Sequence, residues 1–137
     1  MDQQTIDLVR KSSAQVPWQS ARLNSNFQIY LFNASPEAQT AYARGLRNQG
    51  HEMPAFFGAA ADMLSHPEAL NKQLVQLGEK HVGSGIFWSH YSALCHALLA
   101  TLQTELQHQF TPEARSAWSA FYNHVSQRMM LAESAPS

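Results

Sequence analysis

Two long apolar stripes at helical spacing near the end of the chain constrain the fold more than any other sequence feature. Apolar residues recur every three or four positions over 88–108 and again over 112–133, a pattern typical of helices that bury one face. The link around Phe110 is short, which favours antiparallel packing of the two helices. The stripes predict as inward residues Tyr91, Leu94, Cys95, Leu98, Leu102 and Leu106, then Ala114, Trp118, Phe121, Tyr122, Val125 and Met129.

Helix starts are marked in the rest of the chain as well. Ser35-Pro36-Glu37 and Thr111-Pro112-Glu113 each combine a capping side chain, a proline suited to the first turn and an acid near the positive helix end. Alternating patterns typical of strands are absent from the sequence. We therefore expect an all-α fold of about seven helices, at 3–14, 17–33, 36–42, 53–64, 67–82, 88–108 and 112–133, with a loop over 43–52.

Size and composition limit the classes of protein to consider. The chain has 137 residues, enough for a single domain over 1–137, and its 45% hydrophobic and 14% charged residues argue against disorder. A formal charge of −1 gives no electrostatic reason to expect nucleic acid as a partner. No apolar run approaches the roughly 20 residues of a membrane span, and the polar start does not resemble a signal peptide. With Cys95 as the only cysteine, we expect no internal disulfide and a cytoplasmic, soluble protein without membrane insertion.

The helix expected over 67–82 turns a histidine toward the core. Its apolar stripe of Leu70, Leu74 and Leu77 continues to His81, just before a Gly-containing stop. A buried imidazole needs partners for its nitrogens. His81 can meet this need either as a core histidine bonded to a backbone carbonyl or as a metal ligand. The other histidines show neither the spacing of helix-borne zinc ligands nor a nearby CxxC. One inward histidine without such neighbours suits haem, which carries its own equatorial ligands.

Short motifs spread along the chain point to a known family. They are Asp2-Gln-Gln-Thr-Ile, Leu31-Phe32-x-x-x-Pro36-Glu37, Lys80-His81, His90-Tyr91, Leu98-Leu99, Phe110-Thr111-Pro112-Glu113 and Ala117-Trp118. In order and spacing the chain resembles the single-domain bacterial haemoglobins of the Vitreoscilla type and the globin domain of flavohaemoglobins. The resemblance implies a globin fold around a pocket for haem b, iron protoporphyrin IX.

The resemblance also implies roles for residues on the proximal side of the haem. His81 falls on the position of the iron ligand, and Tyr91 and Glu133 fall on the tyrosine and glutamate that hydrogen-bond with it in this family. An acceptor on the imidazole N–H orients the ring and makes it a stronger donor to iron. Ile86 and Leu94 match apolar haem contacts on the same side.

The distal side, where a gas would bind, departs from the family pattern. Gln28, beside Phe27, stands where the family has a tyrosine, and Tyr42 stands where it has a phenylalanine. Met53 falls on the distal glutamine position and Phe57 on a leucine position. Gln28 can donate through its amide, whereas Met53 and Phe57 make the pocket more apolar. We therefore expect ligand affinity and discrimination that differ from those of the family.

Several functions follow from the resemblance. The first is reversible binding of O₂ or NO, with CO as a further ligand, in oxygen transport or NO detoxification. The second is a haem enzyme: an NO dioxygenase supplied by a separate reductase, since no reductase domain follows in the sequence, or a peroxidase-like protein. The others are a gas or redox sensor working through a partner and a haem-free structural globin. The sequence leaves the oligomeric state open between monomer and homodimer.

Overall fold

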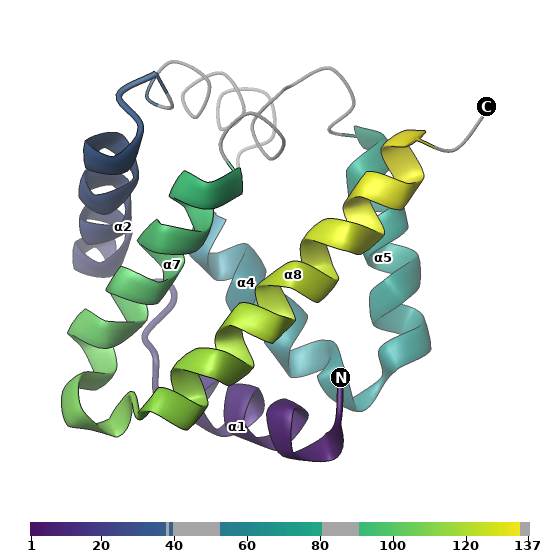
Figure 1. Ribbon diagram of the computed structural model, residues 1–137, viewed down its shortest axis with the longest axis horizontal. Helices are drawn as coiled ribbons and strands as arrows, with labels where there is room; N and C mark the ends of the chain where they lie inside the picture. Colours follow the sequence, from purple (N-terminus) through teal and green to yellow (C-terminus); the bar gives the residue numbers. More distant parts are fainter. Residues whose placement is uncertain (38, 40–52, 81–90, 135–137) are drawn as a thin grey trace.

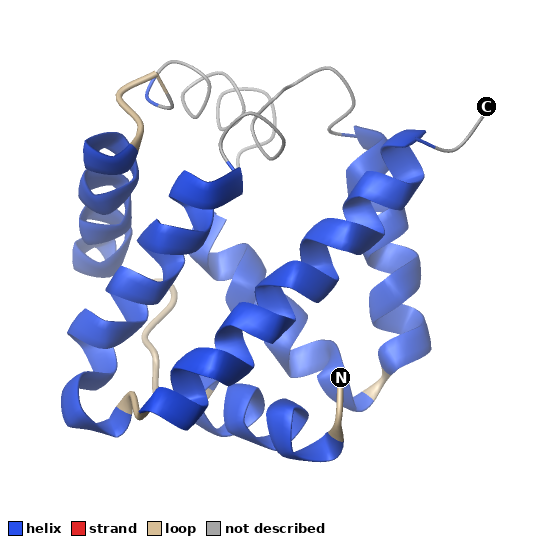
Figure 2. Cartoon of the chain, in the orientation of Figure 1, coloured by secondary structure: helices blue, strands red, loops and turns tan. Residues whose placement is uncertain are grey.

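The computed structural model describes residues 1–37, 39, 53–80 and 91–134. Figure 2 shows these residues as helices joined by loops and turns, without strands, as the sequence pattern predicts. The α-helices are α1 (Gln3–Ser13), α2 (Ala21–Ala34), α4 (Met53–Asp62), α5 (Pro67–Lys80), α7 (Tyr91–Leu106) and α8 (Pro112–Ser134). Short 3₁₀ turns, Met63–Ser65 and Gln107–Gln109, follow α4 and α7. The expected all-α class is confirmed.

Helix α8 is the centre of the packing. It contacts α5 and α1 extensively, while α7 makes its main contact with α2 (Figure 1). Helix α4 contacts α1 and α2 and lies behind α8 in this view. Five of the residues predicted to point inward on α8 are buried, namely Ala114, Trp118, Phe121, Tyr122 and Val125. The sixth, Met129, is outside the set of side chains that the structure describes. The four leucines of the α7 stripe are buried as well, Leu94, Leu98, Leu102 and Leu106. Cys95 is half-buried at the edge of the core, so its predicted inward position is only partly right.

Capping side chains explain where the helices begin. Oδ1 of Asp2 accepts from the N–H of Thr5 at 2.8 Å and starts α1. The expected helix over 17–33 begins only at Ala21, because the hydroxyl of Ser20 accepts from the N–H of Leu23 at 3.3 Å. Thr111 caps α8 through a bond of 3.1 Å from the N–H of Ala114, ahead of a proline in the first turn.

Two polar contacts fix α2 against α7. The guanidinium of Arg22 donates to both carboxylate oxygens of Glu105, at 3.0 and 3.2 Å. Two turns further along α2, the hydroxyl of Tyr30 is 2.6 Å from that of Thr104. Both contacts involve the same turn of α7, through its neighbouring residues Thr104 and Glu105.

The remaining differences concern helix ends. Residues 63–65, the first two of which were expected to be helical, form a 3₁₀ turn. The helix expected over 36–42 begins as a turn at Pro36 and Glu37, and most of it lies outside the described residues. The predicted loop 43–52 also lies outside them. In the part of the chain that the structure describes, no helix is both long and apolar enough to cross a membrane.

Candidate haem site

The side chains of Phe27, Phe57 and Leu94 are fully buried, each with 0% of its surface exposed. They come from three different helices, α2, α4 and α7. The ring of Phe57 contacts the ring of Tyr122 on α8, with centroids 5.8 Å apart. These predicted haem contacts and Tyr122 thus come from four helices and belong to one hydrophobic core.

The helices that carry the predicted proximal residues end at one edge of the molecule. In Figure 1 the end of α5, the start of α7 and the end of α8 all lie along the top. Lys80, which precedes His81, is the last residue of α5, and Tyr91 is the first of α7. Glu133 is in the last turn of α8. His81, Ile86 and Tyr42 lie outside the described residues.

On the predicted distal side, Gln28 is half-buried and follows Phe27 directly on α2. Met53 is the first residue of α4, and Pro54 after it is buried. Gln28 and Met53 are therefore each adjacent in sequence to a buried residue, Phe27 and Pro54.

One edge of α8 carries residues that the sequence pattern did not single out for the site. Ser126 lies four residues after Tyr122 and seven before Glu133, which puts all three positions on the same edge of a helix with about 3.6 residues per turn. Ser126 is 0% exposed, and its hydroxyl has no hydrogen-bond partner. The sequence pattern predicts Tyr122 as a core residue and does not mark Ser126, which lies at helical spacing from both Tyr122 and Glu133.

The other edge of α8 is fixed to α5 by a histidine. Nε2 of His124 is 3.1 Å from Oδ1 of Asn71. Partial burial lowers the pKa of His124, and the positive charges of Arg128 and of the chain's amino terminus lower it further. The neutral imidazole thus helps to hold α8 in register with α5, the helix that leads to His81.

Within the described ranges, no group of three or more His, Cys, Asp or Glu side chains could hold a metal ion. His66, His96 and His108 are exposed in these ranges. His51 and His90 lie outside the described residues.

Comparison with known proteins identifies the family. The family model for globins matches residues 27–129, which is most of the chain. The chain belongs to the globin family. The match begins at Phe27 and includes His81 and Tyr91, but it ends before Glu133.

Relatives of this globin include larger proteins. It is 25% identical over 134 residues to flavohemoprotein B of Dictyostelium discoideum, an alignment that covers 97% of this chain and 32% of the relative. It is also 25% identical to a flavohemoprotein of Vibrio cholerae, over 98% of this chain and 35% of the relative. The chain thus spans about a third of the length of these two proteins. An anaerobic nitrite reductase of rice, Oryza sativa subsp. indica, is 25% identical over 80% of this chain and 83% of its own length.

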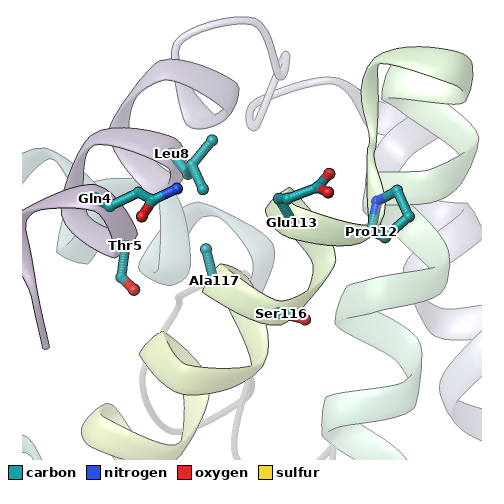
Figure 3. Close-up of a pocket in the computed structure, with 7 residues that line it drawn as sticks. All are labelled: Gln4, Thr5, Leu8, Pro112, Glu113, Ser116 and Ala117. Atoms are coloured by element: carbon teal, nitrogen blue, oxygen red, sulfur yellow. The ribbon is translucent and has the colours of Figure 1, made fainter.

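This globin also has a shallow groove of about 330 Å³ where α1 crosses the start of α8 (Figure 3). Its lining is mixed polar and apolar, with Gln4, Thr5, Leu8, Pro112, Glu113, Ser116 and Ala117. None of the predicted haem residues lines it. The groove is therefore separate from the candidate site.

Proposed function

We propose that this globin binds haem b and that the haem iron, held by His81, reversibly binds O₂ or NO. The observation that carries the proposal is the complete burial of Phe27, Phe57 and Leu94, three predicted haem contacts that come from three helices. Residues far apart in the sequence that were expected around one ligand are all in the core. Family membership supports the same conclusion.

The described side chains fit a porphyrin. A flat apolar macrocycle is bound by aromatic and aliphatic surface, which these residues and Tyr122 supply. Haem supplies an iron atom on which a diatomic gas can bind.

The chain's own residues then divide into two roles. His81 is the proposed iron ligand, oriented by the phenol of Tyr91 and the carboxylate of Glu133. Gln28 is the proposed donor to the bound gas, and Tyr42 and Met53 complete that side of the pocket. A distal hydrogen bond to a polarised ligand contributes roughly 1.5–3 kcal/mol, which is about ten- to a hundredfold in affinity.

A visible spectrum recorded with and without CO tests the proposal directly. We expect recombinant protein supplied with haem to show a Soret band that shifts with CO, and His81→Ala to lose the normal proximal signature. His66→Ala is the matched control, because His66 is exposed at the turn before α5. Protein that takes up no haem overturns the proposal, and so does a His81→Ala variant with an unchanged spectrum.

A second candidate is reduction of nitrite, favoured by the rice relative that this chain matches over most of both lengths. The reaction consumes nitrite, one electron and two protons and yields NO and water. The electron must come from a reductant outside the globin domain, and the same requirement holds for NO dioxygenase activity. Release of NO when nitrite is added anaerobically to the reduced protein tests this activity, and unchanged nitrite overturns it.

A further inference from the structure

Trp18 and Trp118, called the tryptophan pair below, connect the core of the protein to its surface. Their ring centroids are 5.9 Å apart and their planes are tilted by 49°, which is a direct aromatic contact. Trp118 is 0% exposed, whereas Trp18 packs against the core with part of its side chain open to solvent. The pair therefore joins one fully buried indole to one that water reaches.

The indole N–H of each ring is held by a serine at the end of α1. Nε1 of Trp118 donates to the hydroxyl of Ser12 at 2.8 Å, and that hydroxyl donates in turn to the carbonyl of Leu8 at 2.6 Å. Nε1 of Trp18 donates to the carbonyl and the hydroxyl of Ser13, both at 3.1 Å. A hydrogen bond from a charged donor is about twice as strong as one from a neutral donor, so these bonds favour a positive charge on either indole.

The buried end of the pair adjoins a predicted haem contact. Tyr122 follows Trp118 by four residues on α8, and side chains at this spacing are neighbours on one face of a helix. The ring of Tyr122 contacts that of Phe57, with centroids 5.8 Å apart. Aromatic rings thus follow one another from Phe57, through α8, to the partly exposed Trp18.

The difference in burial gives the pair a direction for electron transfer. Tryptophan is among the side chains that lose a single electron most readily, and the loss leaves a positive charge on the indole. A charge is costly in the core but is solvated where water reaches it. The charge is therefore more stable on Trp18 than on Trp118, so an electron taken from Trp118 is replaced from Trp18.

We propose that the tryptophan pair carries electrons from the protein surface to a haem that hydrogen peroxide has oxidised, and so keeps the oxidation out of the core. This inference rests on the proposed haem binding; haem held by histidine is the reactive group of peroxidases too. Reduction of one hydrogen peroxide to two waters takes two electrons and two protons. The protons come from solvent. Each electron passes from Trp118 to the haem, from Trp18 to Trp118, and from a soluble reductant such as ascorbate to Trp18.

The first test finds where the radical resides. Haem-loaded protein is mixed with hydrogen peroxide and a spin trap, and peptide mass spectrometry locates the trapped residue among the chain's three tryptophans and four tyrosines. We expect the adduct at Trp18 in the wild type and its loss in Trp118→Phe, because phenylalanine resists oxidation. Tyr30→Phe is the matched control, since it removes a half-buried oxidisable ring whose hydroxyl bonds Thr104 of α7. It should leave the adduct at Trp18 unchanged.

The second test measures bleaching of the haem by hydrogen peroxide, and it uses Trp18→Phe, a change at the surface end of the pair. Ascorbate should slow bleaching of the wild type and of Tyr30→Phe. It should protect Trp18→Phe much less, because the route from the surface is interrupted. Urea midpoints of all variants show whether each is folded.

Three results overturn the inference. An adduct at Trp18 that persists in folded Trp118→Phe shows that the oxidant reaches Trp18 from solvent. Equal protection by ascorbate in the wild type and Trp18→Phe shows that electrons reach the haem by another route. In a wild type that holds haem, an adduct found only at other residues also overturns it. A wild type that takes up no haem overturns the proposed function itself.

Discussion

The indole ring of Trp18 lies directly on the backbone of Gly58. A Cβ atom at position 58 would be 2.5 Å from Cδ1 and 2.6 Å from Cγ of that ring. The ring cannot easily move aside, because its Nε1 donates to both the carbonyl and the hydroxyl of Ser13 at 3.1 Å. The close contact of α4 with the segment between α1 and α2 thus depends on the absence of a side chain at Gly58.

Gly58→Ala should lower the free energy of unfolding by about 1–3 kcal/mol, as expected for overpacking, despite the better helix propensity of alanine. Urea denaturation measures the change. In a Trp18→Ala background the same substitution should become neutral or stabilising, because the obstructing ring is gone. An equal loss in both backgrounds would contradict the steric explanation.

Adjacent serines at the end of α1 should differ in their contribution to stability. The hydroxyl of Ser12 accepts from Nε1 of the fully buried Trp118 at 2.8 Å. Ser12→Ala leaves that N–H unpaired and should cost about 1–3 kcal/mol in thermal or urea unfolding. Ser13→Ala is the control and should cost no more than about 1 kcal/mol, because the half-buried Trp18 keeps the Ser13 carbonyl as acceptor. Equal losses would exclude the indole bond as the cause.

Gln107, which follows α7, has a φ of 52°, in the left-handed region that favours glycine. Gln107→Gly should therefore stabilise the protein by about 0.5–1 kcal/mol in urea denaturation. Gln109→Gly, at a position without a positive φ, should instead be destabilising. A loss of stability on Gln107→Gly would show that the φ is not strained.

Protonation of His124 should weaken the fold in mildly acidic solution. Burial, Arg128 and the amino terminus hold its pKa below the ordinary value of 6.5. As the pH falls, His124 therefore takes up its proton at a higher pH in the unfolded chain than in the folded chain. The free energy of unfolding consequently decreases as the pH drops below 6.5. Since His124 is only partly buried, we expect a shallow slope in urea midpoints between neutral and acid pH.

Two variants separate His124 from other titrating groups. His124→Gln should remove the part of the pH dependence of the urea midpoint that comes from His124. Asn71→Asp places a carboxylate beside the imidazole, favours its charged form and should reduce or reverse that part. A slope unchanged in both variants would contradict the assignment to His124.

Gln28→Leu tests the proposed donor to the bound gas. In the haem-loaded protein we expect O₂ to dissociate about ten- to a hundredfold faster when the amide is removed. Dissociation of CO, a less polarised ligand, is the internal control and should change much less. An unchanged O₂ rate would show that Gln28 makes no such bond.

The fold was more predictable from the sequence than the details of the site. The leucines of α7 and the aromatic residues of α8 appear as stripes because burial follows helical periodicity. The start of α2 was wrong by four residues, because Pro17 and Ser20 both carry start signals and only the hydroxyl of Ser20 caps the helix. The unpaired hydroxyl of Ser126 depends on how helices pack, which no local pattern contains.

The crossing of α2 and α7 has a consequence for how this globin could diversify. Arg22 and Tyr30 attach α2 to one turn of α7, and Phe27 and Gln28 lie between them along α2. An exchange of the side chain at position 28 therefore removes neither of these two contacts. Under the proposed function, a single substitution at position 28 would therefore change the donor to the bound gas while both contacts between α2 and α7 are kept.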